Sequence, residues 1–201
     1  VKNVREFRLS CPSPDTNHYA DKPTFPVRLR YYSEDRINPA LALPKVSSQN
    51  RRYIPMEVID ADVIAGSKLF LIPDISLYHF GVLTSNVHMA WMRAVCGRLK
   101  SDYRYSKEIV YNTFPWPDTT DDQKAKIEQT AQAILDARAQ YPDCSLADMY
   151  GEKMYLFPEL LKAHQNNDRA VMQAYGFSVK DMTESSCVAE LMKMYQDLVS
   201  R

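Results

Sequence analysis

The chain has few cysteines, few glycines and no long apolar run, and each shortage removes a class of protein. Its 201 residues include four cysteines that lie far apart and form no CxxC pair: Cys11, Cys96, Cys144 and Cys187. This spacing indicates neither a zinc site nor a disulfide framework, so we expect reduced thiols and no metal ligands. The five glycines never occur as GxG, so no glycine-rich turn is evident to hold a nucleotide or S-adenosylmethionine.

Long apolar segments of either kind, membrane-spanning or secretory, are also lacking. No window approaches eighteen uncharged apolar residues, and the N-terminal VKNVREFRLS has no apolar core of the kind found in secretory signals. We therefore expect a cytoplasmic protein with no membrane partner. The chain opens in charged, strand-like sequence, as an excised piece of a longer polypeptide would, and we expect further sequence before it.

Net charge is absent as well, because 25 Lys and Arg balance 25 Asp and Glu. A neutral total argues against a nucleic-acid partner, but the charge is unevenly distributed. Residues 1–117 hold 16 Lys and Arg against 11 Asp and Glu, whereas residues 118–201 hold 9 against 14. A basic half is thus joined to an acidic half. Chance partition of solvated surface charge is the alternative interpretation.

Secondary-structure signals change at the same point. Ten of the twelve prolines lie in residues 1–117, with runs rich in β-branched and aromatic residues: VRLRYY (27–32), RRYIPMEVI (51–59), SKLFLIPDI (67–75) and KEIVYNTF (107–114). These runs predict strands and loops. One helix interrupts them, from about Ser85 to Cys96, with Gly97 able to close it.

Helices dominate the remainder. Thr120 and Gln123 form a capping-box pattern at the start of a helix that extends to about Tyr141. Two more amphipathic helices are predicted over about 158–175 and 185–199. The sequence therefore predicts an α+β fold with two domains: a mixed, loop-rich β domain over 1–117 and a small helical bundle over 118–201.

The most informative residues follow Gly97. If this segment is extended, side chains alternate, and one side presents only charged groups: Arg98, Lys100, Asp102 and Arg104. Lysine can donate to guanine O6 and N7, and a carboxylate can accept from the cytosine N4 amine, so Lys100 and Asp102 together suit a G·C pair in a major groove. The alternative is a solvated strand edge whose charges pair with each other.

Two long stretches carry a family resemblance. PKVSSQNRRYIPMEVIDADVIAGSKLFLIPDISLYHFGVLTSNVHMAWMRAVCGRLKSDYRYS, residues 44–106, resembles the target-recognition domain of the MmeI-like, type IIL restriction–modification enzymes. LLKAHQNNDRAVMQAYGF, residues 160–177, resembles the C-terminal helical segment of those enzymes and of related adenine methyltransferases. Residues 1–38 carry no clear match, although we expect them to belong to the same recognition domain.

The resemblance implies a role for the whole chain. In that family one polypeptide joins a nuclease, an adenine-N6 methyltransferase that uses S-adenosylmethionine, and a recognition domain that serves both. It implies that Lys100 and Asp102 read one base pair of double-stranded DNA and that Arg104 and Lys68 read a neighbouring one. No cofactor is expected within this chain; S-adenosylmethionine and the catalytic site are expected in an upstream methyltransferase domain of the same polypeptide.

Further basic residues are candidates for phosphate contacts, which position a protein on DNA without reading sequence: Arg51, Arg52, Arg93, Arg98 and Lys107.

We expect no catalytic residue. NTFPWP (112–117) lacks the spacing of an adenine-gripping motif and predicts an aromatic-packed joint. His88 and His164 are expected to be structural.

Two other functions remain open from the sequence. The chain could be a standalone specificity subunit that docks on a separate methyltransferase. It could also be a protein-interaction module whose acidic helical half is the working part.

Overall fold

The structure, a computed structural model, describes residues 2–21, 38–63 and 65–200. The described N-terminal residues form two short helices, α1 (Lys2–Leu9) and α2 (Pro14–Asp21). The strand-like interpretation of the first residues is therefore wrong, because Val4 and Phe7 recur at helical spacing and Arg5 Nε donates to the Ala20 carbonyl at 3.1 Å. The run VRLRYY (27–32) lies outside the described residues.

Two small antiparallel sheets lie within residues 38–117. β1 (Ala40–Pro44) lies between β3 (Glu57–Ile59) and β4 (Leu69–Pro73). The second sheet has the order β2-β6-β5, built from β2 (Val46–Ser47), β5 (Gly97–Leu99) and β6 (Asp102–Arg104). The strands predicted within 51–59 and 67–75 are thus confirmed, although each is shorter than its apolar run.

Helices α3 (Leu77–Leu83) and α4 (Asn86–Val95) follow β4. The α4 prediction is confirmed: Ser85 caps its N-terminus, Cys96 is its C-cap, and Gly97 begins the next strand. α3 is missed by the sequence, since seven residues are too few for a clear helical period.

The strand predicted over KEIVYNTF is wrong. Lys107–Tyr111 form a π-helical turn, η1, whose N-terminus the Ser106 hydroxyl caps by accepting from the Ile109 amide. Trp91 Nε1 donates to the Val110 carbonyl at 3.1 Å, and Val110 is buried. A hydrogen bond from another element thus holds β-branched residues in a helical turn, which overrides their strand propensity.

The C-terminal helices follow the predicted boundaries closely. α5 (Asp121–Ala139) begins with the Thr120–Gln123 capping box, and α7 (Pro158–Ala174) ends before Gly176, whose φ is +72°. α8 spans Glu184–Val199. The short α6 (Leu146–Met149) and a 3₁₀ turn, η2 (Met154–Leu156), lie between α5 and α7 and were not predicted.

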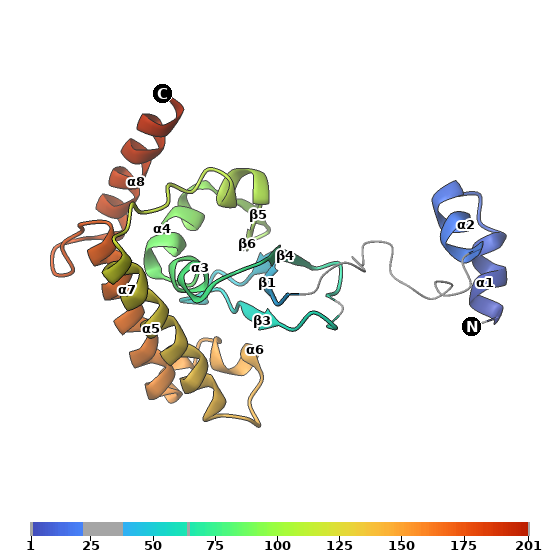
Figure 1. Cartoon of the computed structure of the whole chain (residues 1–201), viewed down its shortest axis with the longest axis horizontal. Helices are drawn as coiled ribbons and strands as arrows, with labels where there is room; N and C mark the ends of the chain where they lie inside the picture. The colour runs from blue at the N-terminus through green and yellow to red at the C-terminus, as the bar shows by residue number, and fades with distance from the viewer. Residues whose placement is uncertain (1, 22–37, 64, 201) are drawn as a thin grey trace.

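One continuous core joins the strands to the helices. Figure 1 shows α3 and α4 between the sheets and the long α5–α7 pair. α3 packs on α5 so closely that a methyl group at Gly81 would lie 2.6 Å from Ile127 Cγ2. α8 packs on α4, so the last predicted helix contacts the N-terminal of the two predicted domains. The α+β class with packed C-terminal helices is confirmed.

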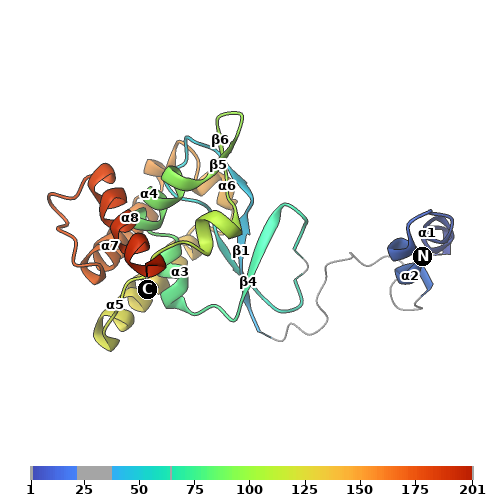
Figure 2. The same ribbon diagram turned by 90° about the horizontal axis from the view of Figure 1, so that it is seen from above.

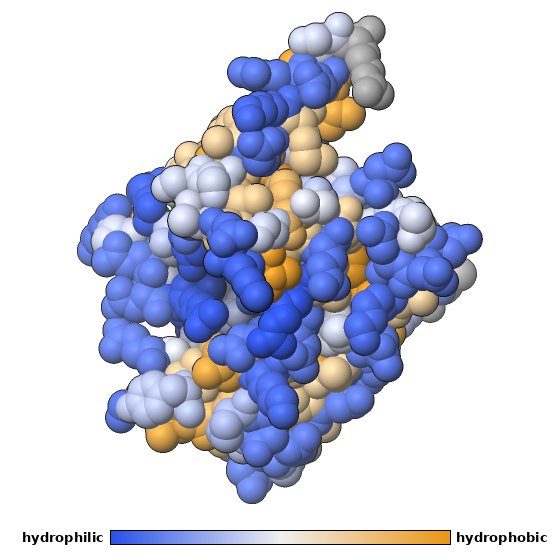
Figure 3. All heavy atoms as spheres, turned by 90° about the vertical axis from the view of Figure 1, so that its left-hand side faces the viewer, coloured by the Kyte–Doolittle hydropathy of each residue, from blue (hydrophilic) through white to orange (hydrophobic). Residues whose placement is uncertain are grey.

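The outer face of the helices is mostly hydrophilic. Figure 3 shows this face, with apolar residues gathered along the projecting α8, where Leu198 and Val199 are exposed. Across residues 2–21, 38–63 and 65–200, no helix combines the length and hydropathy needed to cross a bilayer, and His, Cys, Asp and Glu side chains nowhere cluster in a group fit to hold a metal. The four cysteines are all free thiols.

Candidate nucleic-acid interface

The segment after Gly97 is a tight hairpin and not one extended strand. In the register of β5 and β6, Arg98 lies opposite Tyr103 and Leu99 opposite Asp102, which leaves Lys100 and Ser101 as a two-residue turn. The prediction that four charged residues share one side of a single strand is therefore wrong. The turn is not predicted from the sequence, because its two central residues are neither glycine nor asparagine.

Lys100 has a backbone conformation that rarely suits a lysine. Its φ is +56°, in the left-handed region where a Cβ atom is disfavoured by about 1–2 kcal/mol. Ser101 has a negative φ, so the pair has the φ pattern of a type II′ turn, which normally places glycine where Lys100 stands. Figure 2 shows the hairpin standing out from the body of the domain. The strained turn places the Lys100 side chain, which is exposed, at its tip.

Arg98 braces this turn. Its guanidinium lies 4.2 Å from the centroid of the Tyr103 ring and donates to the Ser101 carbonyl at 3.1 Å. Tyr103 is itself buried, so the arginine is anchored on a fixed surface. Arg98 therefore stabilises the turn, while the other guanidinium N–H groups of Arg98 remain exposed.

Asp102 is held from the opposite side by another loop. Its Oδ1 accepts a hydrogen bond from the Gln49 main-chain amide at 3.3 Å. The carboxylate is half-buried, and no partner for its second oxygen is found among the described residues. One oxygen of Asp102 is thus engaged by the fold and the other is available to a ligand.

Lys68, which precedes β4 of the other sheet, is connected to the end of β6 through Lys45. The Lys45 amide donates to the Lys68 carbonyl and the Lys45 carbonyl accepts from the Tyr105 amide, both at 2.9 Å. Lys45 therefore links the residue before β4 to the residue after β6, and it places Lys68 level with Tyr105, the neighbour of Arg104. The charged groups of Lys68, Lys100 and Arg104 are exposed and have no partner within the described part of the chain.

Lys45 is a basic residue of this surface that sequence reasoning missed. Its Nζ donates to the Ser67 carbonyl at 2.8 Å and lies 4.9 Å from the Phe70 ring centroid. Its position between segments distant in the sequence follows only from strand pairing, and no local pattern signals it.

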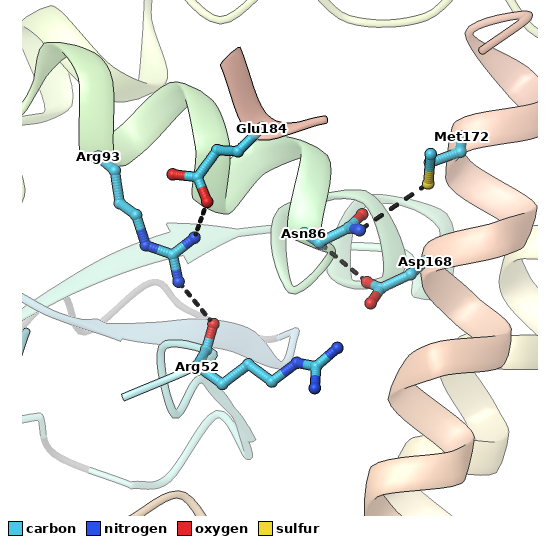
Figure 4. Close-up of polar contacts among 6 residues, drawn as sticks. All are labelled: Arg52, Asn86, Arg93, Asp168, Met172 and Glu184. Atoms are coloured by element: carbon cyan, nitrogen blue, oxygen red, sulfur yellow. Dashed lines mark hydrogen bonds and ion pairs between the residues drawn. The ribbon is translucent and has the colours of Figure 1, made fainter. Parts of the chain in front are cut away.

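The five phosphate candidates are not equivalent. Arg51 is half-buried and Lys107 exposed, and Lys107 lies 3.6 Å from the exposed Glu108 carboxylate. Arg93 is engaged internally: its guanidinium contacts Glu184 Oε2 of α8 and the Arg52 carbonyl, each at 3.1 Å. Figure 4 shows Arg93 between these two partners, with the Arg52 side chain pointing away toward α7. Arg93 joins the two halves of the chain.

A buried polar network makes a second junction. Asp168 of α7 accepts from the Tyr53 hydroxyl at 2.6 Å and from the Asn86 amide at 2.8 Å. Burial raises the pKa of Asp168 to about 6, against the opposing effect of these two hydrogen bonds. The Tyr53 ring stacks on His164 at 4.2 Å between centroids.

Arg138 extends the same junction to β3. Its Nη1 donates to the Met56 carbonyl at 2.8 Å and lies 3.6 Å from Glu57 Oε2, while its Nε donates to the Tyr150 hydroxyl at 2.9 Å. Tyr150 in turn lies 2.7 Å from His164 Nε2. The loop before β3, α5 and α7 are thus tied by polar contacts as well as by the core.

Both histidines predicted to be structural are buried. His88 Nε2 lies 3.0 Å from the Tyr105 hydroxyl, and burial lowers the pKa of His88 to about 4. Burial, aided by nearby arginines, lowers the pKa of His164 well below its usual range. Both rings are therefore neutral at pH 7, and each has a tyrosine hydroxyl as its partner.

The predicted aromatic joint is confirmed. Trp116 makes edge contacts with His79, Tyr111 and Phe114, at 5.4, 6.3 and 5.5 Å between centroids. The Tyr175 hydroxyl donates to the Pro115 carbonyl at 2.8 Å. Residues 112–117 thus pack between α3, η1 and the end of α7.

The chain matches two known domain families over its whole length. A model of the MmeI target recognition domain matches residues 1–118, and a model of the MmeI C-terminal domain matches residues 119–201. The chain is 38% identical over 169 residues to DNA methyltransferase A of Bacillus subtilis (strain 168), a match that covers 84% of this chain and 19% of that protein.

A solved structure shows the same fold. The type IIL restriction-modification enzyme MmeI, in complex with DNA, superposes with a TM-score of 0.85 and 42% sequence identity over 100% of this chain and 26% of that one. The chain therefore spans about a fifth to a quarter of the length of these proteins.

Proposed function

The chain belongs to the MmeI-like family of type IIL restriction–modification proteins, of which it comprises the target recognition and C-terminal domains, and on this basis we propose that it reads a specific sequence in double-stranded DNA. Residues 1–117 carry the reading surface, and residues 118–201 brace it. Catalysis and S-adenosylmethionine binding belong to a methyltransferase domain of the same polypeptide, and no step is assigned to residues of this chain.

The observation that carries this proposal is the conformation of Lys100. A non-glycine residue at φ +56° costs stability, strain of this kind is concentrated at functional sites, and this residue stands exposed at the tip of a braced hairpin. Beside it, Asp102 keeps one oxygen available. An ammonium donor next to a carboxylate acceptor suits guanine O6 and N7 on one strand and the cytosine N4 amine on the other.

Affinity has a separate source. Lys68 and Arg104 are proposed to read a neighbouring base pair, whereas Arg51, Arg52, Arg98 and Lys107 lie within the basic half as phosphate contacts. Each phosphate neutralised releases counterions and makes binding dependent on salt. Reading and holding are therefore divided between residues at the tip and residues around it.

The test is binding-site selection by the 201-residue chain from a randomised duplex pool at low salt, where phosphate contacts are strongest. We expect enrichment of a short motif that contains a G·C pair, with affinity that falls steeply as salt rises. Binding with no enriched motif, or no binding at low salt, contradicts the proposal for this chain.

A further inference from the structure

A second turn lies beside the reading hairpin. Residues Ser48–Arg51 form a tight turn, in which the Arg51 amide donates to the Ser48 carbonyl at 3.2 Å and the Asn50 amide donates to Ser48 Oγ at 3.3 Å. Gln49 and Asn50 occupy the two central positions. The turn directly follows β2, so strand pairing fixes its root: Ser47 of β2 lies opposite Tyr103 of β6.

Two side-chain contacts hold the turn in place. The Gln49 amide donates to Asp102 Oδ1 at 3.3 Å, which joins the turn to the hairpin. Asn50 Nδ2 donates to Glu152 Oε1 at 2.6 Å, which joins it to the helical half. The backbone of Gln49 is thus held on both sides, beside a carboxylate placed to read a base.

The Gln49 side chain is left unengaged by these contacts. It is exposed, and its carboxamide has no partner among the residues that the structure describes. Asn50 carries the same chemical group, but its Nδ2 already donates a hydrogen bond to Glu152. A carboxamide offers an acceptor and a donor side by side, which match the N6 amine and N7 of adenine in the major groove.

We propose that Gln49 is a further base-reading residue, which recognises adenine in an A·T pair neighbouring the pair read by Lys100 and Asp102. This inference rests on the proposed function. The carboxamide oxygen of Gln49 accepts a hydrogen bond from adenine N6, and the carboxamide nitrogen of Gln49 donates one to adenine N7. Its main-chain amide also fixes Asp102, so the two neighbouring contacts are coupled through one hydrogen bond.

The experiment uses the same selection from randomised duplexes with four forms of the 201-residue chain: wild type, Gln49→Ala, Gln49→Arg and Gln173→Ala. Gln173 is an exposed glutamine of α7 and serves as the matched control. We expect Gln49→Ala to lose about tenfold of the preference for A·T at one position, since a good bidentate contact discriminates by about 5-fold to 150-fold. Gln49→Arg should shift that position toward G·C, and Gln173→Ala should leave every position unchanged.

The outcomes separate the two proposals. If wild type enriches no motif, the proposed function fails. If wild type enriches a motif that Gln49→Ala and Gln49→Arg both reproduce unchanged, the proposed function stands and the role of Gln49 is overturned. A uniform loss of affinity at all positions, with the preferences intact, also overturns it, because that result marks Gln49 as a positioning or phosphate contact. Circular dichroism of each variant verifies that the fold is retained.

Discussion

The carboxylate of Asp168, in the middle of α7, accepts a hydrogen bond at 2.8 Å from the main-chain amide of Asn86, the first residue of α4. A helix begins with amide groups that have no intrahelical acceptor, and a negative charge at this end is stabilising. The C-terminal half of the chain thus supplies a cap to the helix that leads into the β5–β6 hairpin. The same carboxylate accepts from Tyr53, so the junction is fixed at two points.

This junction makes stability depend on pH. The pKa of Asp168 is raised to about 6, so the protonated carboxyl favours the folded state. Its contribution to the free energy of unfolding is fully present below the unfolded-state pKa near 4 and is lost as pH rises through 6. His88 acts in the opposite direction: its pKa is lowered to about 4, so stability is lost as pH falls below about 6.5. His164 adds to the loss at acid pH. Two histidines outweigh one carboxyl, so we expect the free energy of unfolding to fall between pH 6.5 and pH 4.5.

Replacement of Asp168 isolates its part. Asp168→Asn removes the only one of these three groups that favours the folded state at acid pH, so the decline from pH 6.5 to 4.5 should become steeper. Urea unfolding at several pH values measures this slope, and comparing slopes cancels the loss of one hydrogen-bond acceptor at every pH. An unchanged slope would show that Asp168 does not titrate in this range.

Lys100 offers a way to separate folding from reading. Lys100→Gly relieves the left-handed strain, so we expect the free energy of unfolding to stay level or rise by about 1 kcal/mol. The same change removes the donor to guanine and should abolish preference at one base pair. Thermal unfolding together with binding-site selection tests both effects. A variant that loses stability but keeps its motif contradicts the assignment of Lys100.

The contact between α3 and α5 depends on a missing side chain. A Cβ at position 81 would meet Ile127 Cγ2 at 2.6 Å and Asn167 Oδ1 at 3.1 Å. Gly81→Ala should therefore cost about 1–3 kcal/mol through overpacking, although alanine normally stabilises a helix interior. Gly66→Ala is the matched control, because a Cβ there meets nothing within 4 Å. Equal unfolding midpoints in urea for the two variants would contradict this close approach.

Local signals predicted the helices well and the backbone geometry of the candidate site only in part. The capping box at Thr120 and the glycine at position 176 mark helix ends through contacts within a few residues, and both were found. The Lys100 turn was missed because it uses a strained lysine in place of glycine. The surrounding fold imposes strain of this kind, so no pattern in the local sequence reveals it.

Long-range pairing accounts for the other misses. Lys45 links the residue before β4 to the residue after β6, and Gln49 contacts a carboxylate 53 residues away. Neither relation can be found without the sheet register. The family resemblance names Lys68 together with Arg104 without any knowledge of this register, and the backbone pairing through Lys45 places Lys68 level with Tyr105, the neighbour of Arg104.

The basic residues differ in what their removal should do. Arg51 has no partner for its guanidinium among the described residues, so Arg51→Gln should lower the salt dependence of DNA binding by about 0.9 in the slope of log affinity against log salt. Arg93 is engaged with Glu184 and the Arg52 carbonyl, so Arg93→Gln should leave that slope unchanged and cost on the order of 1 kcal/mol of stability. Binding titrations over a range of salt concentrations and urea unfolding decide between the two roles. The reverse pattern would show that Arg93 leaves Glu184 for a phosphate on the duplex.

An exchange of charge at the hairpin tests the reading chemistry directly. Lys100→Glu together with Asp102→Arg places the acceptor where the donor stood and the donor where the acceptor stood, so the preferred pair should change from G·C to C·G while neighbouring positions keep their preferences. Arginine at position 102 cannot accept from the Gln49 amide, so we also expect a several-fold loss of affinity through weaker ordering of the Gln49 turn. Selection from a randomised duplex pool measures both effects in one experiment. If the exchanged chain enriches the wild-type motif, then the ionic side chains at the tip do not face the bases, and specificity must come from another surface of the domain.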